Sequence, residues 1–137
     1  MARPGKAELI AAAVAASQRA VAPYSNFHVG AALLTRDGKI ITGANVESAS
    51  YGLTCCAERI ALFKALTEGH AHFLAVAVVA PVTGGAMPCG ACRQLLAEYA
   101  PDAKVWTADS RNPRRIRAFT VRTLLPHAFR EVPGRGS

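Results

Sequence analysis

The middle of the chain reads Phe73-Leu74-Ala75-Val76-Ala77-Val78-Val79-Ala80, an apolar run without a charged residue. A strand exposed on one face alternates apolar and polar residues, whereas a strand that is apolar throughout is covered on both faces. The run has the length of a strand and is far short of the ~20 apolar residues that a membrane-spanning helix needs. We therefore expect residues 73–80 to form a central strand with a layer of structure on each side.

Helical patterns precede and follow this strand. Residues 56–68 predict a helix that Gly69 closes, and residues 89–99 predict a helix that Pro101 stops. The other expected elements are a helix over 6–20, strands over 27–35 and 39–46 joined by a turn at Asp37-Gly38, strands over 104–108 and 116–120, and a short helix over 123–128. Strands separated by helices indicate parallel crossovers, and the opening hairpin makes the sheet mixed. The pattern predicts the α/β class.

Length and composition fit one domain. The chain has 137 residues, of which 51% are hydrophobic, and we expect a core over about residues 6–130 followed by a polar tail over 131–137. The alanine-rich N-terminal stretch carries Glu8, Gln18 and Arg19, which predicts an amphipathic helix of a cytoplasmic protein rather than a signal peptide.

Four cysteines could form two disulfides, but disulfide scaffolds are usually shorter and richer in cysteine.

The net charge of +7 is concentrated near the C-terminus. Residues 104–137 carry eight basic and two acidic residues, against eight and seven in residues 1–103. Such a cluster could attract phosphates. Only Phe119 interleaves with the arginines as an aromatic residue, so a solvated surface is the favoured interpretation and a nucleic-acid partner is not expected. The arginines that lie close together are Arg111, Arg114, Arg115, Arg117 and Arg122.

Two short segments carry the chemistry. The first segment is Thr54–Arg59 (TCCAER), which contains Cys55, Cys56 and Glu58. The second is Pro88–Gln94 (PCGACRQ), which contains Cys89 and Cys92. Three thiolates leave the fourth position of a zinc ion open for water, which is typical of a catalytic rather than a structural site. A carboxylate that is not a ligand can move protons for that water. Both segments enter predicted helices, whose N-termini favour the thiolate form of cysteine.

The neighbours of these cysteines leave alternatives open. Arg59 lies three residues after Cys56 on the same helix face, where it could offset the net charge of −1 of Zn²⁺ with three thiolates; it could also be a surface residue. The Cys-x-Glu spacing selects Cys56 as the ligand. Cys55 is then a small buried residue or a spare thiol. A closed structural zinc site would need a fourth ligand, and the histidines lack ligand-like spacing; they are His28, His70, His72 and His127.

Cys56-Ala57-Glu58 together with Pro88–Cys92 resembles the zinc-dependent nucleoside and nucleobase deaminases. Further segments resemble the small cytidine deaminases over about residues 6–130: Tyr24–Ala32, Gly43–Glu47, Ser50–Leu53, Cys92–Gln94 and Leu124–Phe129. The resemblance implies a three-layer helix/mixed β-sheet/helix sandwich of about five strands and one Zn²⁺ per subunit. It also implies hydrolytic deamination of cytidine and 2′-deoxycytidine to uridine and 2′-deoxyuridine by a zinc-activated water, in pyrimidine salvage.

The resemblance implies a role for each matching residue. Glu58 would be the catalytic acid/base, and the metal ligands would be Cys56, Cys89 and Cys92. Asn45 and Glu47, two apart at the end of the expected strand over 39–46 and therefore pointing the same way, would hold the 3′ side of the sugar. The other substrate contacts would be Phe27 and Ala57, while Arg59 and Gln94 would lie next to the site.

Members of this size with three cysteine ligands resemble homotetramers, whereas longer members with a histidine ligand resemble dimers. Tyr51 and Phe129 would then complete the site of a neighbouring subunit. The sequence after Phe129 differs from the family pattern.

Three other functions fit part of the sequence. Blasticidin-S-type deaminases share the zinc residues, but their substrates lack an ordinary ribose, and Asn45-Val46-Glu47 argues against them. Enzymes that edit nucleic acids need a channel with stacking aromatic residues, and Glu47 would repel a 3′-phosphate. A non-enzymatic zinc module is the remaining alternative.

Overall fold

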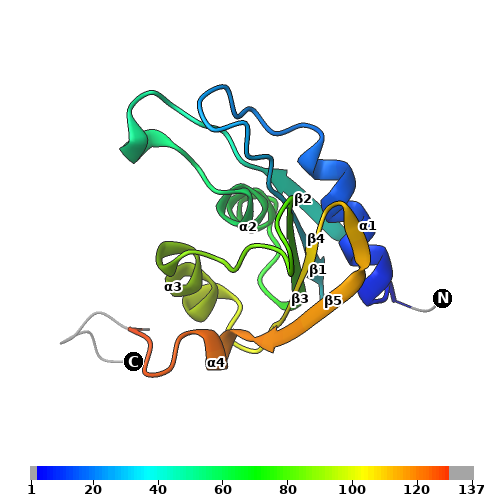
Figure 1. Ribbon diagram of the computed structural model, residues 1–137. Coiled ribbons are helices and arrows are strands. Elements are labelled where there is room, and N and C mark those ends of the chain that lie inside the picture. Colours follow the sequence, from blue (N-terminus) through cyan, green and yellow to red (C-terminus); the bar gives the residue numbers. More distant parts are fainter. Residues whose placement is uncertain (1–2, 130–137) are drawn as a thin grey trace.

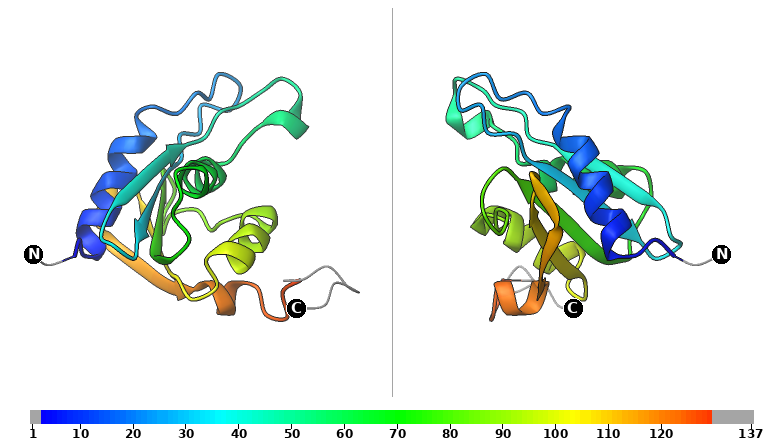
Figure 2. Two further views of the ribbon diagram at one scale, coloured as in Figure 1. Left: turned by 180° about the vertical axis from the view of Figure 1, so that it is seen from behind. Right: turned by 45° about the vertical axis from the view of Figure 1, so that its right-hand side comes forward.

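The structure is a computed structural model that describes residues 3–129, and it has three layers (Figure 1). A mixed five-stranded sheet forms the middle layer. One helix, α1 (Lys6–Ser17), covers one face, while α2 (Ala57–Thr67) and α3 (Gly90–Tyr99) cover the other (Figure 2). The predicted three-layer α/β sandwich is thus confirmed. No helix among residues 3–129 is long and apolar enough to cross a membrane.

The sheet has the strand order β2-β1-β3-β4-β5. Its strands are β1 (Gly30–Thr35), β2 (Ile40–Ala44), β3 (Phe73–Ala80), β4 (Lys104–Asp109) and β5 (Asn112–Thr120). The central strand, β3, pairs antiparallel with β1 and parallel with β4. Because β3 has a neighbour on each edge and helices on each face, its apolar sequence is buried almost throughout, as its composition predicts.

Alternate residues of β3 serve two separate cores. Val76 and Val78 pack toward α2 and α3, whereas Ala77 and Val79 pack toward α1. Two glycines let the helices approach the sheet closely. A Cβ on Gly30 would lie 2.0 Å from the Ala13 carbonyl oxygen of α1, and one on Gly43 would lie 2.6 Å from the Ala57 carbonyl oxygen of α2.

Several predicted boundaries are wrong, for identifiable reasons. The strand predicted over 27–35 begins only at Gly30, and the one predicted over 39–46 ends at Ala44. The Asn45 side chain takes the hydrogen bonds of Phe27 and Val29 that strand pairing would otherwise use. Asn45 and Glu47 therefore lie in the loop beyond β2 rather than on a strand.

The remaining boundary errors are local. The first helix ends at Ser17 instead of residue 20, and Val21 already bridges to Val46. β5 begins at Asn112 instead of residue 116, since the Asp109 carboxylate accepts from the Arg111 N–H in a tight turn. The last helix, α4, spans Val121–Leu124 instead of 123–128, because the Thr120 hydroxyl caps it at an earlier position.

The arginine cluster lies along β5 and the residues on either side of it, at one edge of the sheet. Arg111 pairs with Asp109 at 2.8 Å, and Arg122 pairs with Asp102 at 2.8 Å. The Arg117 guanidinium lies 5.1 Å from the centre of the Phe119 ring. Charged residues and Pro113 on an edge strand discourage pairing with the sheet of another molecule.

Candidate metal centre and catalytic pocket

Three cysteines converge from two helix starts. Cys56 is the N-cap of α2, Cys89 is the N-cap of α3, and Cys92 lies in the first turn of α3. Their sulfur atoms lie within 4.8 Å of one another. The Sγ–Sγ distance is 3.8 Å from Cys56 to Cys89 and 3.5 Å from Cys89 to Cys92. Thiolates 2.3 Å from a tetrahedral zinc ion would be about 3.8 Å apart, so the cluster fits zinc.

The electrostatics of the cluster favour a thiolate at Cys56. A hydrogen bond from Cys92, followed by contacts with Arg59 and Cys89, lowers the pKa of Cys56 to about 5. The same bond and burial raise the pKa of Cys92. Arg59 donates from Nη2 to Cys56 Sγ at 3.5 Å and to the Thr54 carbonyl at 3.3 Å. Within residues 3–129 the buried Nε of Arg59 has no hydrogen-bond partner.

Glu58 lies beside the cluster but outside it. The residue is in the first turn of α2, and its side chain is only 6% exposed. Burial raises the pKa of the Glu58 carboxyl. Glu58, Cys56 and Cys89 line one cavity of about 190 Å³. The rest of its lining is Phe27, Val29, Asn45, Thr54, Cys55, Ala57, Val78, Ala86 and Met87. A cavity with mostly apolar walls and a few polar groups is typical of small-molecule sites.

Cys55 lies in the wall of this cavity and is not part of the sulfur cluster. Its backbone N–H and carbonyl pair with Val46. This pairing fixes the approach of the chain to α2, so that Cys56 is the cysteine at the helix start. Burial raises the pKa of the Cys55 thiol, which keeps it protonated.

The two polar residues after β2 are engaged within the chain. Asn45 Oδ1 accepts from the Val29 N–H at 2.9 Å, and Asn45 Nδ2 donates to the Phe27 carbonyl at 2.9 Å. Glu47 Oε1 accepts from the N–H groups of Tyr24 and Ser25, both at 3.1 Å. Asn45 lines the cavity beside the cysteines, whereas Glu47 lines an adjoining hollow. Thr54 borders both spaces.

Tyr51 and Phe129 do not line the cavity beside the cysteines. Tyr51 begins the short 3₁₀ turn η1 (Tyr51–Leu53), which projects from the body of the molecule (Figure 2), and it is 86% exposed. Phe129 is 55% exposed, and its carbonyl accepts from Gln94 Nε2. Gln94 thus joins α3 to Phe129 through this hydrogen bond.

Arg93 was not singled out by sequence reasoning. It donates from Nε to the Pro88 carbonyl at 2.7 Å and from Nη1 to the Leu124 carbonyl at 3.1 Å. These bonds join the loop that carries Cys89 to the end of α4. Its place between Cys92 and Gln94 in the motif is the only signal in the sequence that could have identified it.

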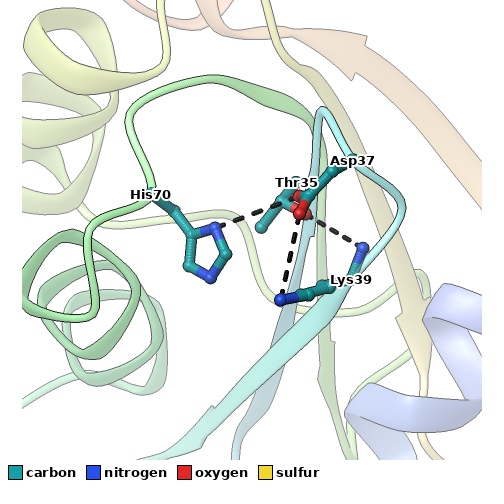
Figure 3. A network of polar contacts seen from close by, with 4 residues as sticks. All are labelled: Thr35, Asp37, Lys39 and His70. Atoms are coloured by element: carbon teal, nitrogen blue, oxygen red, sulfur yellow. Dashed lines mark hydrogen bonds and ion pairs between the residues drawn. The ribbon is translucent and has the colours of Figure 1, made fainter.

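Among residues 3–129, none of the histidines belongs to the cysteine cluster. His70 instead faces Asp37, with 4.0 Å between Nδ1 and Oδ1 (Figure 3). Asp37 also accepts from the Thr35 hydroxyl at 2.5 Å and lies 4.0 Å from Lys39 Nζ. This network ties the β1–β2 turn to the segment after α2, so His70 has a structural partner.

Comparisons with known proteins agree with this geometry. Residues 5–108 match the family model for the cytidine and deoxycytidylate deaminase zinc-binding region. A cytidine deaminase of Halalkalibacterium halodurans is 53% identical over 122 residues, which cover 88% of this chain and 91% of that protein. One of Sporosarcina psychrophila is 46% identical, with 89% of each chain covered. The crystal structure of cytidine deaminase from Burkholderia pseudomallei has a TM-score of 0.86 at 48% identity and covers 92% of this chain and 100% of that one.

Proposed function

Because the chain belongs to the cytidine and deoxycytidylate deaminase family, we propose that it hydrolyses cytidine and 2′-deoxycytidine to uridine and 2′-deoxyuridine, releasing ammonia. One observation carries the proposal. Two of the three clustered cysteines and the buried carboxyl of Glu58 line the same cavity, which therefore combines metal-binding groups with a proton carrier.

Cys56, Cys89 and Cys92 would hold one zinc ion per chain. When bound, zinc acts as a Lewis acid that lowers the pKa of a water molecule at its open position. The three thiolates give the site excess negative charge, and the Arg59 contact with Cys56 Sγ offsets part of it.

Glu58 carries the protons of the reaction. Its carboxylate accepts a proton from the attacking water, which adds to C4 of the cytosine ring. Glu58 then donates this proton to ring N3, takes the remaining proton from the oxygen now bonded to C4, and gives it to the leaving amine, so one water is consumed and one ammonia is released. A raised pKa suits this task, because a group that both accepts and donates works best near the ambient pH.

The cavity walls would position the base. Phe27 supplies an aromatic face, and the backbone N–H of Ala57, at the first position of α2, is free of helical hydrogen bonding and can contact a polar atom of the ring. Asn45 Nδ2 keeps one N–H, and the Glu47 carboxylate keeps acceptor capacity, beyond the bonds that each makes within the chain. A donor and an acceptor together suit a sugar hydroxyl.

A homotetramer would complete the site. Tyr51 and Leu53 are 86% and 74% exposed on a projecting turn, and Phe129 is 55% exposed, so these large side chains are available to contact another subunit. In a tetramer these residues would contact the neighbouring subunit and border its cavity. Light scattering of the purified protein gives the oligomeric state, and a monomer with full activity would contradict shared sites.

The enzyme would work in the cytoplasm, in pyrimidine salvage.

The deciding experiment is a cytidine turnover assay with a zinc count on the same sample. We expect conversion to uridine with one zinc per chain. Preference for blasticidin S would assign the chain to that class of deaminase. Tight binding of single-stranded RNA or DNA at physiological salt, in competition with cytidine, would favour an editing enzyme.

A non-enzymatic zinc module would bind zinc without turnover. It would also ignore a hydrated-pyrimidine transition-state analogue, because only an open metal position can take the hydroxyl of that compound.

A further inference from the structure

Ser25 connects two residues that the proposed function assigns to the substrate. Its N–H donates to Glu47 Oε1 at 3.1 Å, and its hydroxyl donates to Glu47 Oε2. The same hydroxyl oxygen accepts from the Phe27 N–H at 3.0 Å. One exposed serine therefore uses its backbone donor, its side-chain donor and its side-chain acceptor on these two neighbours.

These bonds determine which part of the Glu47 carboxylate remains free. An ionised carboxylate offers about four acceptor positions. The N–H groups of Tyr24 and Ser25 take two positions on Oε1, and the Ser25 hydroxyl takes one on Oε2. The capacity that remains is on Oε2, beside the serine hydroxyl. The Ser25 bonds are also the main reason why the pKa of Glu47 is lowered, which keeps the group an acceptor.

The Phe27 segment is fixed at both ends. Asn26 has a left-handed φ of 57°, so the chain turns sharply between Ser25 and Phe27. The Ser25 hydroxyl holds the N–H of Phe27, and Asn45 holds its carbonyl. Without the serine hydroxyl, one of these two constraints and one of the three bonds to Glu47 would be lost.

We propose that Ser25 is a positioning residue for sugar recognition, which orients the Glu47 carboxylate toward the 3′ hydroxyl of the nucleoside. This role rests on the proposed function, since it acts through the contact of Glu47 with the sugar. Ser25 itself lies outside the cavity that contains Cys56 and Glu58. It should therefore influence binding of the sugar and leave the chemical step unchanged.

Steady-state kinetics of Ser25→Ala with a series of sugars tests the proposal. We expect KM for cytidine and 2′-deoxycytidine to rise by about tenfold, the effect of losing one hydrogen bond to a charged group. The kcat should stay within about twofold, because Glu58 is untouched. KM for 2′,3′-dideoxycytidine, which has no 3′ hydroxyl, should change little. Ser25→Thr, which retains a hydroxyl, should restore KM.

Two further variants complete the design. Ser17→Ala removes a hydroxyl that bonds the Val14 carbonyl at 2.6 Å on α1, far along the chain from Glu47, and should leave KM unchanged for every sugar. In a Glu47→Gln background, Ser25→Ala should raise KM no further, because its effect passes through the carboxylate. Calorimetry of uridine binding to the same variants compares their affinities independently of turnover.

The outcomes are distinguishable. If Glu47→Gln raises KM and Ser25→Ala does not, the positioning role is rejected while the sugar contact stands. If Ser25→Ala raises KM for 2′,3′-dideoxycytidine as much as KM for cytidine, the serine serves folding alone and the proposal is overturned. The same holds if Ser25→Ala lowers kcat for all substrates. If Glu47→Gln leaves cytidine KM and uridine binding unchanged, the sugar contact in the proposed function fails, and the role of Ser25 with it.

Discussion

The Arg59 guanidinium lies 3.5 Å from the sulfur of Cys56, one helical turn earlier on α2, and donates to it from Nη2. The same Nη2 donates to the Thr54 carbonyl at 3.3 Å. One cation thus neutralises a thiolate and fixes the chain that leads to it. The contact with this cation is one of the causes that lower the pKa of Cys56 and favour its thiolate.

Arg59→Gln should weaken both catalysis and metal binding. Loss of the cation leaves the cluster with more negative charge, and residues that support metal ligands typically contribute 10–100-fold, so we expect a fall of about that size in kcat or zinc affinity. Turnover and chelator competition measure the two effects. Arg122→Gln, which breaks an exposed ion pair with Asp102, is the matched control and should change neither. Unchanged values for Arg59→Gln would show that the side chain serves only the Thr54 carbonyl.

Glu58→Ala should abolish most deamination while the protein keeps its zinc. Proton transfer by a positioned side chain typically contributes about 10²–10⁴-fold, and among residues 3–129 no other carboxyl lines the cavity. Turnover of cytidine and metal analysis of the same sample give the result. An active variant would disprove the acid/base role, and loss of zinc would indicate that the carboxyl is needed for the structure of the site.

Glu58→Gln should stabilise the metal-free protein at neutral and alkaline pH. Burial raises the pKa of Glu58 above its ordinary value of 4.5, so the folded state holds the proton more tightly than the unfolded state. The stability of the wild type should then fall as pH rises from about 4.5 through the raised pKa, and the neutral amide removes this loss. Melting temperatures at pH 4 and pH 8 measure it. If Glu58→Gln raised the melting temperature equally at pH 4 and at pH 8, ionisation of Glu58 would not be the cause.

The adjacent cysteines Cys55 and Cys56 should respond differently to substitution by serine. Cys56→Ser removes a group from the sulfur cluster and should lower zinc content and activity together. Cys55→Ser is the matched control one position away, and it should retain one zinc per chain because that sulfur lies outside the cluster. Zinc loss in Cys55→Ser, with zinc retained in Cys56→Ser, would reverse the assignment of the ligand.

Gly43→Ala should destabilise the fold and disturb the metal centre. The added Cβ would lie 2.6 Å from both the Ala57 carbonyl oxygen and the Ala61 nitrogen, so α2 must move away from β2. Overpacking of this kind costs about 1–3 kcal/mol. Gly52→Ala is the control, since a Cβ there meets no atom within 4 Å. Thermal unfolding and zinc content measure the effects, and equal melting temperatures for the two variants would show that α2 can shift without cost.

Sequence patterns located the elements most accurately where local and long-range preferences agree. Residues 73–80 were predicted as a central strand and form β3 with those bounds, because an apolar run has no local polar group that competes with pairing. The pattern failed at residues 27–29 and 45–46, where the strands were predicted to continue. There the Asn45 side chain bonds the backbone of Phe27 and Val29, and hydropathy carries no information about such a bond.

The sequence by itself determined the chemical types at the site: two helix starts with cysteines, a carboxyl two residues after the first, and an arginine one turn later. These features are local, because helix capping and helical spacing depend on residues close together in the chain. Only the tertiary structure decided that Cys56 and Cys89 bring their sulfurs to within 3.8 Å, that Glu58 is buried beside them, and that Ser25 bonds Glu47. Those relationships depend on how the helices and loops pack around the sheet, and packing joins residues that local sequence preferences cannot connect.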